Sequence, residues 1–353
     1  MSSFEKPTKQ RRLDSTTYLL SDQVRCGNNV MLQIAQMMPL RRALTPQFRD
    51  VLGVKAAIQS RIHTPEAIEL LFTAIRDGQT GIVKALLDAG ADKDGKNSHG
   101  DTPLHIAVYY GRIDIVKLLL DRCADVEVKD NDSATPLHLA ARGGDTMMIT
   151  LLLDAGANKN ARARCGETPL HAAAWYGHNA TVRFLLDAGV KNESNTLLNE
   201  DTPLHNAAER GRTDTVQLLL DAGANMNVQG LSGNTPLHMA VRTNRTDVVK
   251  LLLARGTNKE MYNMYGDTPL HSAAFYGKVN IAKILLNAGA NKDVINDEGW
   301  TPLHWAAKNG HINIVKMLLD AGADKEVVNN GGMTPLRWAI TKAHTDIVNL
   351  LSA

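Results

Sequence analysis

Short apolar segments separated by polar segments rich in Gly, Asn and Asp recur along most of this chain. Residues 115–120 and 314–319 are two such apolar segments, and residues 291–299 form a typical polar one. Apolar segments of this kind predict short helices, whereas clusters of Asn, Asp and Gly predict turns. The pattern therefore predicts an all-α protein made of many short helices joined by tight turns.

The tetrapeptide Thr-Pro-Leu-His marks the start of each unit of this pattern. It begins at Thr102, Thr135, Thr168, Thr202, Thr235, Thr268 and Thr301, and Thr334 opens an eighth copy that carries Arg in place of His. The copies are 33 residues apart except for one interval of 34. Residues 72–92 fit one period earlier as a degenerate first copy, so the sequence predicts nine units in a stack.

This period and its tetrapeptide resemble the ankyrin repeat over roughly residues 65–353. The resemblance implies an all-α solenoid of helix-turn-helix units with β-hairpin-like loops between them. The units would start near residues 69, 102, 135, 168, 202, 235, 268, 301 and 334. In similar proteins, the ends of the first helices and the tips of the loops line a concave groove that binds a partner protein.

Each position of a unit has a local physical reason. Thr is a good helix N-cap and Pro suits the first helical position, where no backbone N–H is required. Leu104 would face neighbouring helices, and Ala107 is small enough to let them approach closely. Gly111 and its equivalents are expected just past a helix end, in the left-handed region. One unit of about 33 residues cannot bury its own apolar face, so stability must come from stacking.

Five departures from the repeat single out particular positions. One extra residue lies between Gly189 and Thr202, and Glu200 stands where other units have a turn glycine. Asn244, Ala343 and Cys123 occupy positions where other units end a helix with glycine. A left-handed residue other than Gly costs about 1–2 kcal/mol, and Asn less. We therefore expect residues 197–201 to form the weakest junction in the stack.

The N-terminal part differs from the repeats in charge. Residues 1–64 hold ten Lys and Arg against four Asp and Glu, and the remainder holds twenty-nine against thirty-three. We expect residues 1–16 to be a disordered basic tail and residues 17–64 a helical segment that caps the first unit, with helices over 29–40 and 45–60. At the other end, Arg337 makes the last unit more polar, as a terminal repeat requires.

Composition narrows the class of protein. The chain of 353 residues is 44% hydrophobic and 22% charged, with a net charge of +2. The repeats offer no sustained basic stripe for nucleic acid, no apolar stretch of the N-terminal part is long enough to enter a membrane, and no secretory signal is visible. We expect an intracellular protein, cytoplasmic rather than nuclear. Its cysteines, Cys26, Cys123 and Cys165, are too few and too widely separated for a disulfide framework or a thiolate metal site.

The residues that could carry out catalysis or bind a metal do not form a site for either. A row of histidines follows the tetrapeptide at His105, His138, His171, His205, His238, His271 and His304. A metal site would need further ligands at suitable spacing, so we interpret these residues as structural hydrogen-bonding groups that tie each unit to the next. No nucleophile or phosphate-binding motif is present, and Cys165 is expected to be an exposed, ordinary thiol. We therefore predict no catalytic residue, no metal and no cofactor.

Aromatic and charged residues point instead to a binding surface. Several units carry them in the two positions before the glycine that ends the first helix, and others lie at the loops. Exposed aromatics beside Arg are typical anchors of protein interfaces. The alternative is that some of the rings pack on the next unit, as expected for Trp305 and Trp338. The candidate partner-binding residues are Tyr109, Tyr110, Arg142, Trp175, Tyr176, Glu209, Arg210, Arg242, Tyr265, Phe275, Tyr276 and Trp300.

The sequence thus predicts a monomeric, non-enzymatic scaffold or adaptor that binds a protein, and neither nucleic acid nor the membrane interior. An alternative is a target-selecting subunit whose N-terminal segment recruits other machinery, such as a ubiquitin-ligase component or a membrane surface, as a pathogen effector could. An enzyme with its site in the N-terminal part is disfavoured, because about sixty residues cannot easily build and shield an active site.

Overall fold

The computed structural model describes residues 59, 62, 64–196 and 200–353, and these residues form nine consecutive pairs of helices without a strand. The all-α class and the nine units are confirmed. The pairs are α3 (Pro65–Arg76) with α4 (Thr80–Asp88), α5 (Pro103–Tyr109) with α6 (Ile113–Asp121), α7 (Pro136–Gly143) with α8 (Thr146–Asp154), α9 (Pro169–Tyr176) with α10 (Asn179–Asp187), α11 (Pro203–Arg210) with α12 (Thr213–Asp221), α13 (Pro236–Arg242) with α14 (Thr246–Ala254), α15 (Pro269–Phe275) with α16 (Val279–Asn287), α17 (Pro302–Lys308) with α18 (Ile312–Asp320), and α19 (Pro335–Thr341) with α20 (Thr345–Ser352).

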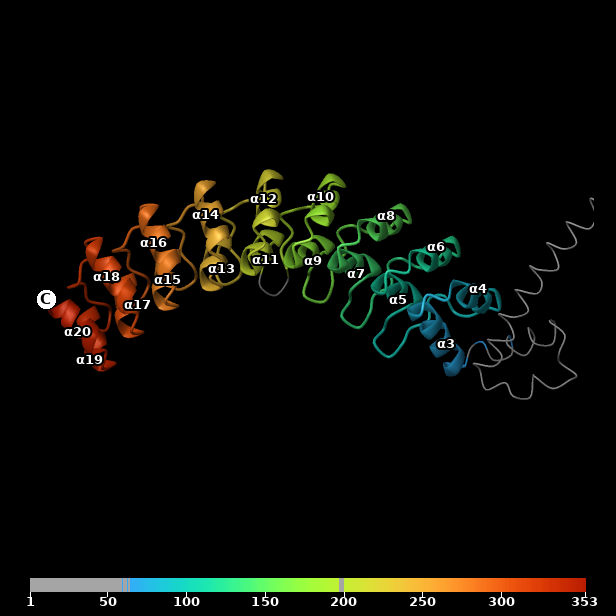
Figure 1. Ribbon diagram of the computed structural model, residues 1–353, viewed down its shortest axis with the longest axis horizontal. Helices are drawn as coiled ribbons and strands as arrows, with labels where there is room; N and C mark the ends of the chain where they lie inside the picture. Colours follow the sequence, from blue (N-terminus) through green and yellow to red (C-terminus); the bar gives the residue numbers. More distant parts are fainter. Residues whose placement is uncertain (1–58, 60–61, 63, 197–199) are drawn as a thin grey trace, which may run out of the picture. The chain divides into compact units, whose positions relative to one another are not determined.

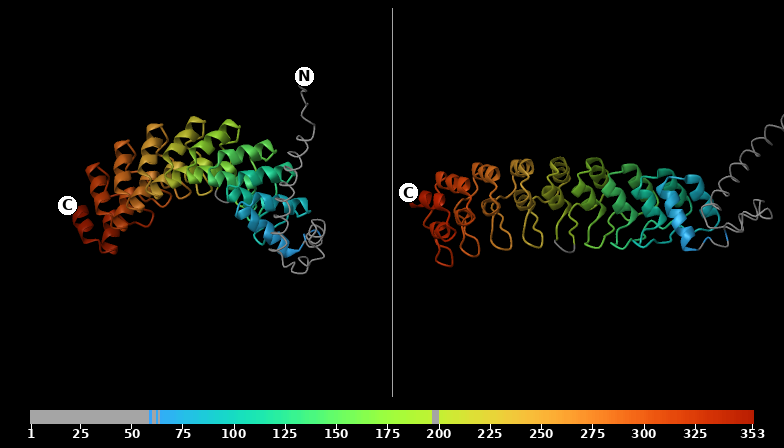
Figure 2. Two further views of the ribbon diagram at one scale, coloured as in Figure 1. Left: turned by 45° about the vertical axis from the view of Figure 1, so that its right-hand side comes forward. Right: turned by 60° about the horizontal axis from the view of Figure 1, so that its bottom comes forward.

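The helices fall into two compact units. The first comprises the described residues up to Pro136 together with Asp154–Ala157, and the second comprises Leu137–Leu153 and Asn158–Ala353. In the second unit, α9, α11, α13, α15, α17 and α19 form one row, and their partners from α10 to α20 form another (Figure 1). The loops between successive pairs project side by side from this unit (Figure 2).

Most of the first helices begin in the same way. In α5, the hydroxyl of Thr102 accepts from the backbone N–H of His105, while the His105 ring accepts from the backbone N–H of Thr102. This reciprocal pair is a capping box with His in the place usually taken by Glu or Gln. Capping boxes of this kind also begin α9, α11, α13, α15 and α17. The tetrapeptide is thus a helix start, as the sequence predicts.

The helix-ending glycines are needed for two reasons. Gly177 has φ 79° and Gly211 has φ 71°, in the left-handed region that favours glycine. In addition, a Cβ atom on Gly177 would lie 2.6 Å from Arg212 Cδ, and one on Gly211 would lie 2.7 Å from Arg245 Cδ. The arginines approach this closely because they cross the glycine to reach the preceding unit.

These crossing side chains form a tie between units that the sequence analysis did not identify. Arg245 Nε donates to the carbonyl oxygen of Glu209 at 3.0 Å, and the ring of His178 bonds the carbonyl oxygen of Arg142 at 2.9 Å. Both acceptors lie in the last turn of a first helix, where carbonyl groups have no partner within the helix. The residue before several of the second helices therefore satisfies an orphan group of the unit before it.

The loops are hairpin-like without forming strands in the described residues. Within one loop, Asn263 N donates to Asp267 O at 2.9 Å, and Gly266 N donates to Asn263 O at 3.0 Å. Between neighbouring loops a single backbone bond is made, such as Met264 N to Ser232 O at 3.0 Å. This loop contact and the ring-to-carbonyl bonds described below keep successive loops in register.

The expected departures from glycine are seen at the helix ends and turns. Cys123, Glu200, Asn244 and Ala343 all have φ between 53° and 61°. The structure adds Ser133, with φ 60°, at a turn position that the sequence analysis passed over. All five positions therefore carry a backbone conformation that glycine would adopt more easily.

The first pair differs from the others at its start. Helix α3 begins at Pro65 after Thr64, four residues before the start near 69 that the period suggests, and runs for 12 residues. Thr64 and Pro65 are thus a Thr-Pro start that lies out of register with the period, in the copy that the sequence indicates to be degenerate. The expected basic tail at 1–16 and the proposed helices at 29–40 and 45–60 lie outside the described residues, apart from residue 59.

Candidate functional site

The histidine row is a set of buried hydrogen-bonding groups. The ring of His171 bonds the carbonyl oxygen of Asp201 through Nε2 at 3.0 Å, and that of His238 bonds the carbonyl oxygen of Asp267 at 3.0 Å. The same bond is made by His105, His138, His205, His271 and His304, in each case to the loop that precedes the next first helix. The structural interpretation of these histidines is confirmed.

Burial also sets the charge of these rings. The carbonyl acceptor requires Nε2 to carry the proton, and Nδ1 accepts from the backbone N–H of the capping Thr, which only a neutral ring can do. Burial lowers the pKa of His171, His205 and His238 to about 4, and it lowers the pKa of His105, His271 and His304 as well. At neutral pH these six histidines bring no charge to the surface near them.

Most of the predicted aromatics are exposed at the ends of the first helices. In the first compact unit, the ring of Tyr109 is 68% exposed and meets Tyr110 edge-on at 5.1 Å. In the second, Tyr176, Phe275 and Tyr276 are exposed as well. An exposed ring loses much of its contact with water when a partner covers it, which is the property expected of an anchor.

Three of the predicted charged residues are engaged within the second unit. The Arg210 guanidinium lies 3.9 Å from the centre of the Trp175 ring, so this partly buried ring already carries a cation. Arg242 Nη2 donates to Glu209 Oε1 at 2.9 Å. The side chain of Arg142 is exposed, as expected.

Trp300 is buried, so the prediction that it lies on the exposed surface is wrong. Only 5% of its surface is accessible, because the ring is enclosed by rings from its own unit and the next. Trp305 stacks on it with centroids 4.2 Å apart, and Trp338 lies 4.9 Å away. The Lys308 ammonium lies over all three rings at 4.5–4.9 Å. Trp300 is therefore part of the packing between units, whereas Trp305 and Trp338 keep some exposure.

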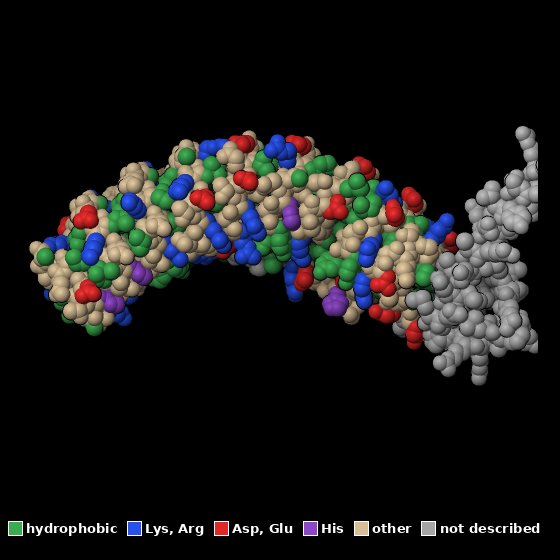
Figure 3. Space-filling view, viewed as in Figure 1, with side chains coloured by type: hydrophobic (Ala, Val, Ile, Leu, Met, Phe, Trp, Pro, Cys, Tyr) green, Lys and Arg blue, Asp and Glu red, His purple; other side chains and the backbone are tan. Residues whose placement is uncertain are grey.

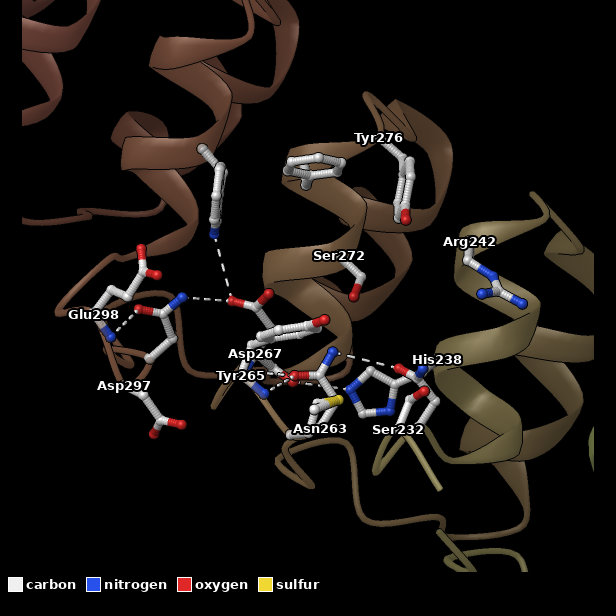
Figure 4. A pocket seen from close by; sticks show the side chains of 15 residues that line it. Ser232, His238, Arg242, Asn263, Tyr265, Asp267, Ser272, Tyr276, Asp297 and Glu298 are labelled. Atoms are coloured by element: carbon white, nitrogen blue, oxygen red, sulfur yellow. Dashed lines mark hydrogen bonds between the residues drawn. The ribbon is translucent and has the colours of Figure 1, made fainter. Parts of the chain in front are cut away.

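Four of the candidate partner-binding residues, Arg242, Tyr265, Phe275 and Tyr276, line a pocket of about 500 Å³ in the second compact unit. Helix α13 supplies Arg242 and His238, helix α15 supplies Phe275, and Tyr276 lies directly after α15. Tyr265 comes from the loop before α15. Figure 4 shows Arg242 and His238 on one side of the opening, and Glu298 with Asp297 on the other.

Several pocket residues were not predicted. Asp267 lies at the end of one loop, and its Oδ1 accepts from Asn296 Nδ2 at 2.8 Å and from Trp305 Nε1 at 3.4 Å. Asp297 and Glu298 come from the next loop and are exposed. These two residues lie 33 positions after Met264 and Tyr265. Asp297 and Glu298 could have been found by comparing loop-tip positions one period apart, together with the helix-end positions.

Cysteine exposure also differs from expectation. Cys123 is exposed, whereas Cys165 is only partly exposed. Cys123 replaces a helix-ending glycine, and its left-handed backbone places the side chain at the surface of the turn. Of these two thiols, Cys123 is therefore the more accessible, contrary to the expectation for Cys165.

In the part of the chain that the structure describes, no three His, Cys, Asp or Glu side chains converge as metal ligands would. Among the same residues, no helix has the length and apolar character needed to cross a bilayer.

Side chains of both charges occur on one face of the second unit (Figure 3). On the face shown in Figure 3, Lys and Arg side chains are interspersed with Asp and Glu along this unit. That surface offers no extended cationic stripe of the kind that follows a phosphate backbone.

Comparison with known families gives one clear result. A family model described as ankyrin repeats, in three copies, matches residues 49–132, 122–196, 187–263, 204–296, 255–329 and 289–353. These overlapping matches cover every helix pair that the structure describes. A search of the curated proteins returns no significant match to the chain.

Proposed function

The chain belongs to the ankyrin-repeat family, whose repeats form modules for protein–protein interaction, and we propose that it is a non-enzymatic scaffold or adaptor. Its partner protein would bind the surface made by the ends of the first helices and the loops. The observation that carries the proposal is the pocket lined by Arg242, Tyr265, Phe275 and Tyr276. Four residues selected as candidate anchors from the sequence meet there around one hollow.

The physical basis is the exposure of rigid aromatic side chains beside a polar rim. Tyr265 is 61% exposed, and Phe275 and Tyr276 stand at the pocket edge. Burying such rings in a desolvated contact contributes strongly to binding, whereas the residues around them mainly exclude water. A specific interface covers about 800 Å² on each partner, which several adjacent units can supply.

A test requires the natural partner to be captured and its affinity measured. We expect Tyr276→Ala or Trp175→Ala to reduce the binding free energy of the partner by about 2 kcal/mol or more without unfolding the chain. This corresponds to a roughly thirty-fold lower affinity. Partners captured from a lysate by the wild-type chain would be identified by mass spectrometry. The dissociation constant of each would then be measured by calorimetry with both variants.

A matched control is available on the other row of helices. Met147 is an exposed apolar residue in the first turn of α8, a second helix, so Met147→Ala should leave the affinity unchanged. Equal affinity for the wild-type chain and for both aromatic variants would place the binding surface elsewhere. The recruiting role of residues 1–64 lies almost entirely outside the described residues, and a partner bound by residues 1–64 alone would support the target-selecting alternative.

A further inference from the structure

The pocket of about 500 Å³ in the second unit has the size of a site for one ligand group. Its volume falls within the range of about 300–1,000 Å³ that such sites occupy. Rings from Phe275, Tyr265, Tyr276 and Trp305 contribute to its lining, together with three carboxylates. The chemistry of its occupant can be argued from the charges and the rings together.

The carboxylates leave the pocket with an excess of negative charge. Asp267, Asp297 and Glu298 line it, and none of them forms an ion pair among the described residues. The two hydrogen bonds to Asp267 come from the neutral side chains of Asn296 and Trp305. These bonds orient the carboxylate but do not cancel its charge.

The basic residues in the lining do not balance this charge. Arg242 is the single arginine or lysine there, and it is paired with Glu209 outside the pocket at 2.9 Å. His238 also lines the pocket, but its Nε2 is held by the Asp267 carbonyl and its Nδ1 by the Thr235 N–H, so the ring is neutral. The pocket therefore favours a positively charged occupant.

The chain places cations of its own on aromatic rings of this unit, and one of them, Lys308, lies over Trp305 beside this pocket. Arg210 lies over Trp175, and Lys308 lies over Trp300, Trp305 and Trp338. One unit after Phe275, the position equivalent to Arg210 is occupied by Asn309. The Asn309 side chain is neutral and donates to the Phe275 carbonyl oxygen at 3.0 Å. Phe275 therefore receives no cation from this position, whereas the Lys308 ammonium already lies over Trp305.

We propose that this pocket receives an arginine side chain from an extended segment of the partner protein. A guanidinium group stacks on aromatic faces and also donates in pairs to a carboxylate, which an ammonium group cannot do in the same planar geometry. The rings and carboxylates of the pocket offer both kinds of contact within one hollow. The inference rests on the proposed function and specifies the chemistry that the partner presents.

Selection from a peptide library tests the proposal without knowledge of the partner. Random twelve-residue peptides displayed on phage would be selected on the full-length chain, and in parallel on the double variant Asp297→Asn, Glu298→Gln. We expect peptides selected on the wild-type chain to share an arginine, and the double variant to lose that enrichment. Both substituted residues are exposed, so the double variant should fold as the wild-type chain does.

Calorimetry with one selected peptide then measures the contribution of the side chain. Replacing the shared arginine with glutamine should weaken binding at least ten-fold, and replacing it with lysine should weaken binding several-fold. The charge-matched control Asp320→Asn, Asp346→Asn removes two exposed carboxylates from α18 and α20 and should leave the affinity unchanged.

Defined outcomes would overturn the inference. Selected peptides without arginine, equal binding of arginine and lysine peptides, or equal affinity of the double variant would each do so. The inference would also be overturned if the chain bound only a second copy of itself, and if sedimentation showed that the double variant no longer self-associates. A partner that binds normally to the double variant but is lost from Tyr276→Ala would remove this inference while supporting the proposed function. A partner unaffected by Tyr276→Ala and Trp175→Ala would remove the proposed surface itself.

Discussion

At the scale of single residues, the histidine row shows how one side chain can serve two units. The ring of His205 closes the capping box of its own helix through Nδ1, and its Nε2 bonds the carbonyl oxygen of Asn234 in the loop of the next unit. Both contacts require the neutral ring, since protonated Nδ1 could no longer accept the Thr202 N–H. Arg337 takes the place of this histidine in the last described pair.

The neutral histidines make stability depend on pH. Their pKa is about 4 in the folded chain for His171, His205 and His238, against about 6.5 when unfolded. The unfolded chain therefore binds more protons between these values, so the contribution is fully present above about pH 6.5 and is lost as pH falls toward 4. We expect the free energy of unfolding to decrease by about 2 kcal/mol for each of the three at pH 5 relative to pH 7.5.

Urea unfolding at the two pH values would measure this loss. The variant His205→Gln keeps a donor for the Asn234 carbonyl but cannot be protonated in this range, so its pH-dependent loss should be smaller by about 2 kcal/mol. Ring resonances of His171, His205 and His238 that titrate near pH 6.5 in the folded protein would contradict the expectation.

At the scale of helices and turns, the ends are fixed by left-handed residues. Ala343 has φ 57° between α19 and α20, where Gly310 holds the equivalent position one unit earlier with φ 79°. Alanine in this conformation is strained, whereas glycine is not. The exposed Ala343 therefore marks a helix end that is less stable than its equivalents.

Replacing this alanine should stabilise the chain. We expect Ala343→Gly to raise the free energy of unfolding by about 1 kcal/mol, the relief of strain less the greater freedom of glycine when unfolded. Asn244→Gly should raise the free energy of unfolding by only about a few tenths of a kcal/mol, because Asn tolerates the left-handed region. The reverse change, Gly310→Ala, should destabilise, since a Cβ there would lie 2.8 Å from His344 Cε1. Thermal and urea unfolding of the three variants would measure these changes. A lower stability of Ala343→Gly than of the wild-type chain would contradict the proposed strain at Ala343.

At the scale of the whole molecule, stability is expected to be shared among units and their interfaces. The interval that contains the extra residue interrupts this regularity. Glu200 has φ 53°, and Thr196 N and Asp201 O bond at 2.9 Å across the turn, while residues 197–199 lie outside the described residues. The weak junction at 197–201 therefore remains a prediction.

Unfolding followed at separate tryptophans would test this junction. Trp175 precedes it, and Trp300, Trp305 and Trp338 follow it, so the chain carries natural probes on both sides. With fluorotryptophan labels, we expect the NMR signal of Trp175 to lose its native position at a urea concentration different from that of the other three. The variant Glu200→Gly should bring the two midpoints closer. A single midpoint shared by all four signals in the wild-type chain would contradict a weak junction.

The site was predictable only in part. Tyr276, Phe275, Tyr265 and Arg242 could be selected because helix-end and loop positions recur at a fixed period and are exposed in several units. Trp300 could not be assigned in the same way, because its burial depends on rings from Trp305 and Trp338 rather than on its own position. The pocket carboxylates were missed because charge balance depends on which neighbours pair, as Arg242 does with Glu209.

The sequence by itself determined the number of units, the start and end of most helices and the structural role of the histidines. These features depend on local hydrogen bonding and backbone conformation, which repeat whenever the same residues recur every 33 positions. Tertiary structure alone decided which rings stay exposed and where negative charge remains unbalanced. Those properties arise from side chains of different units meeting in space, so the period can indicate their positions but not their contacts.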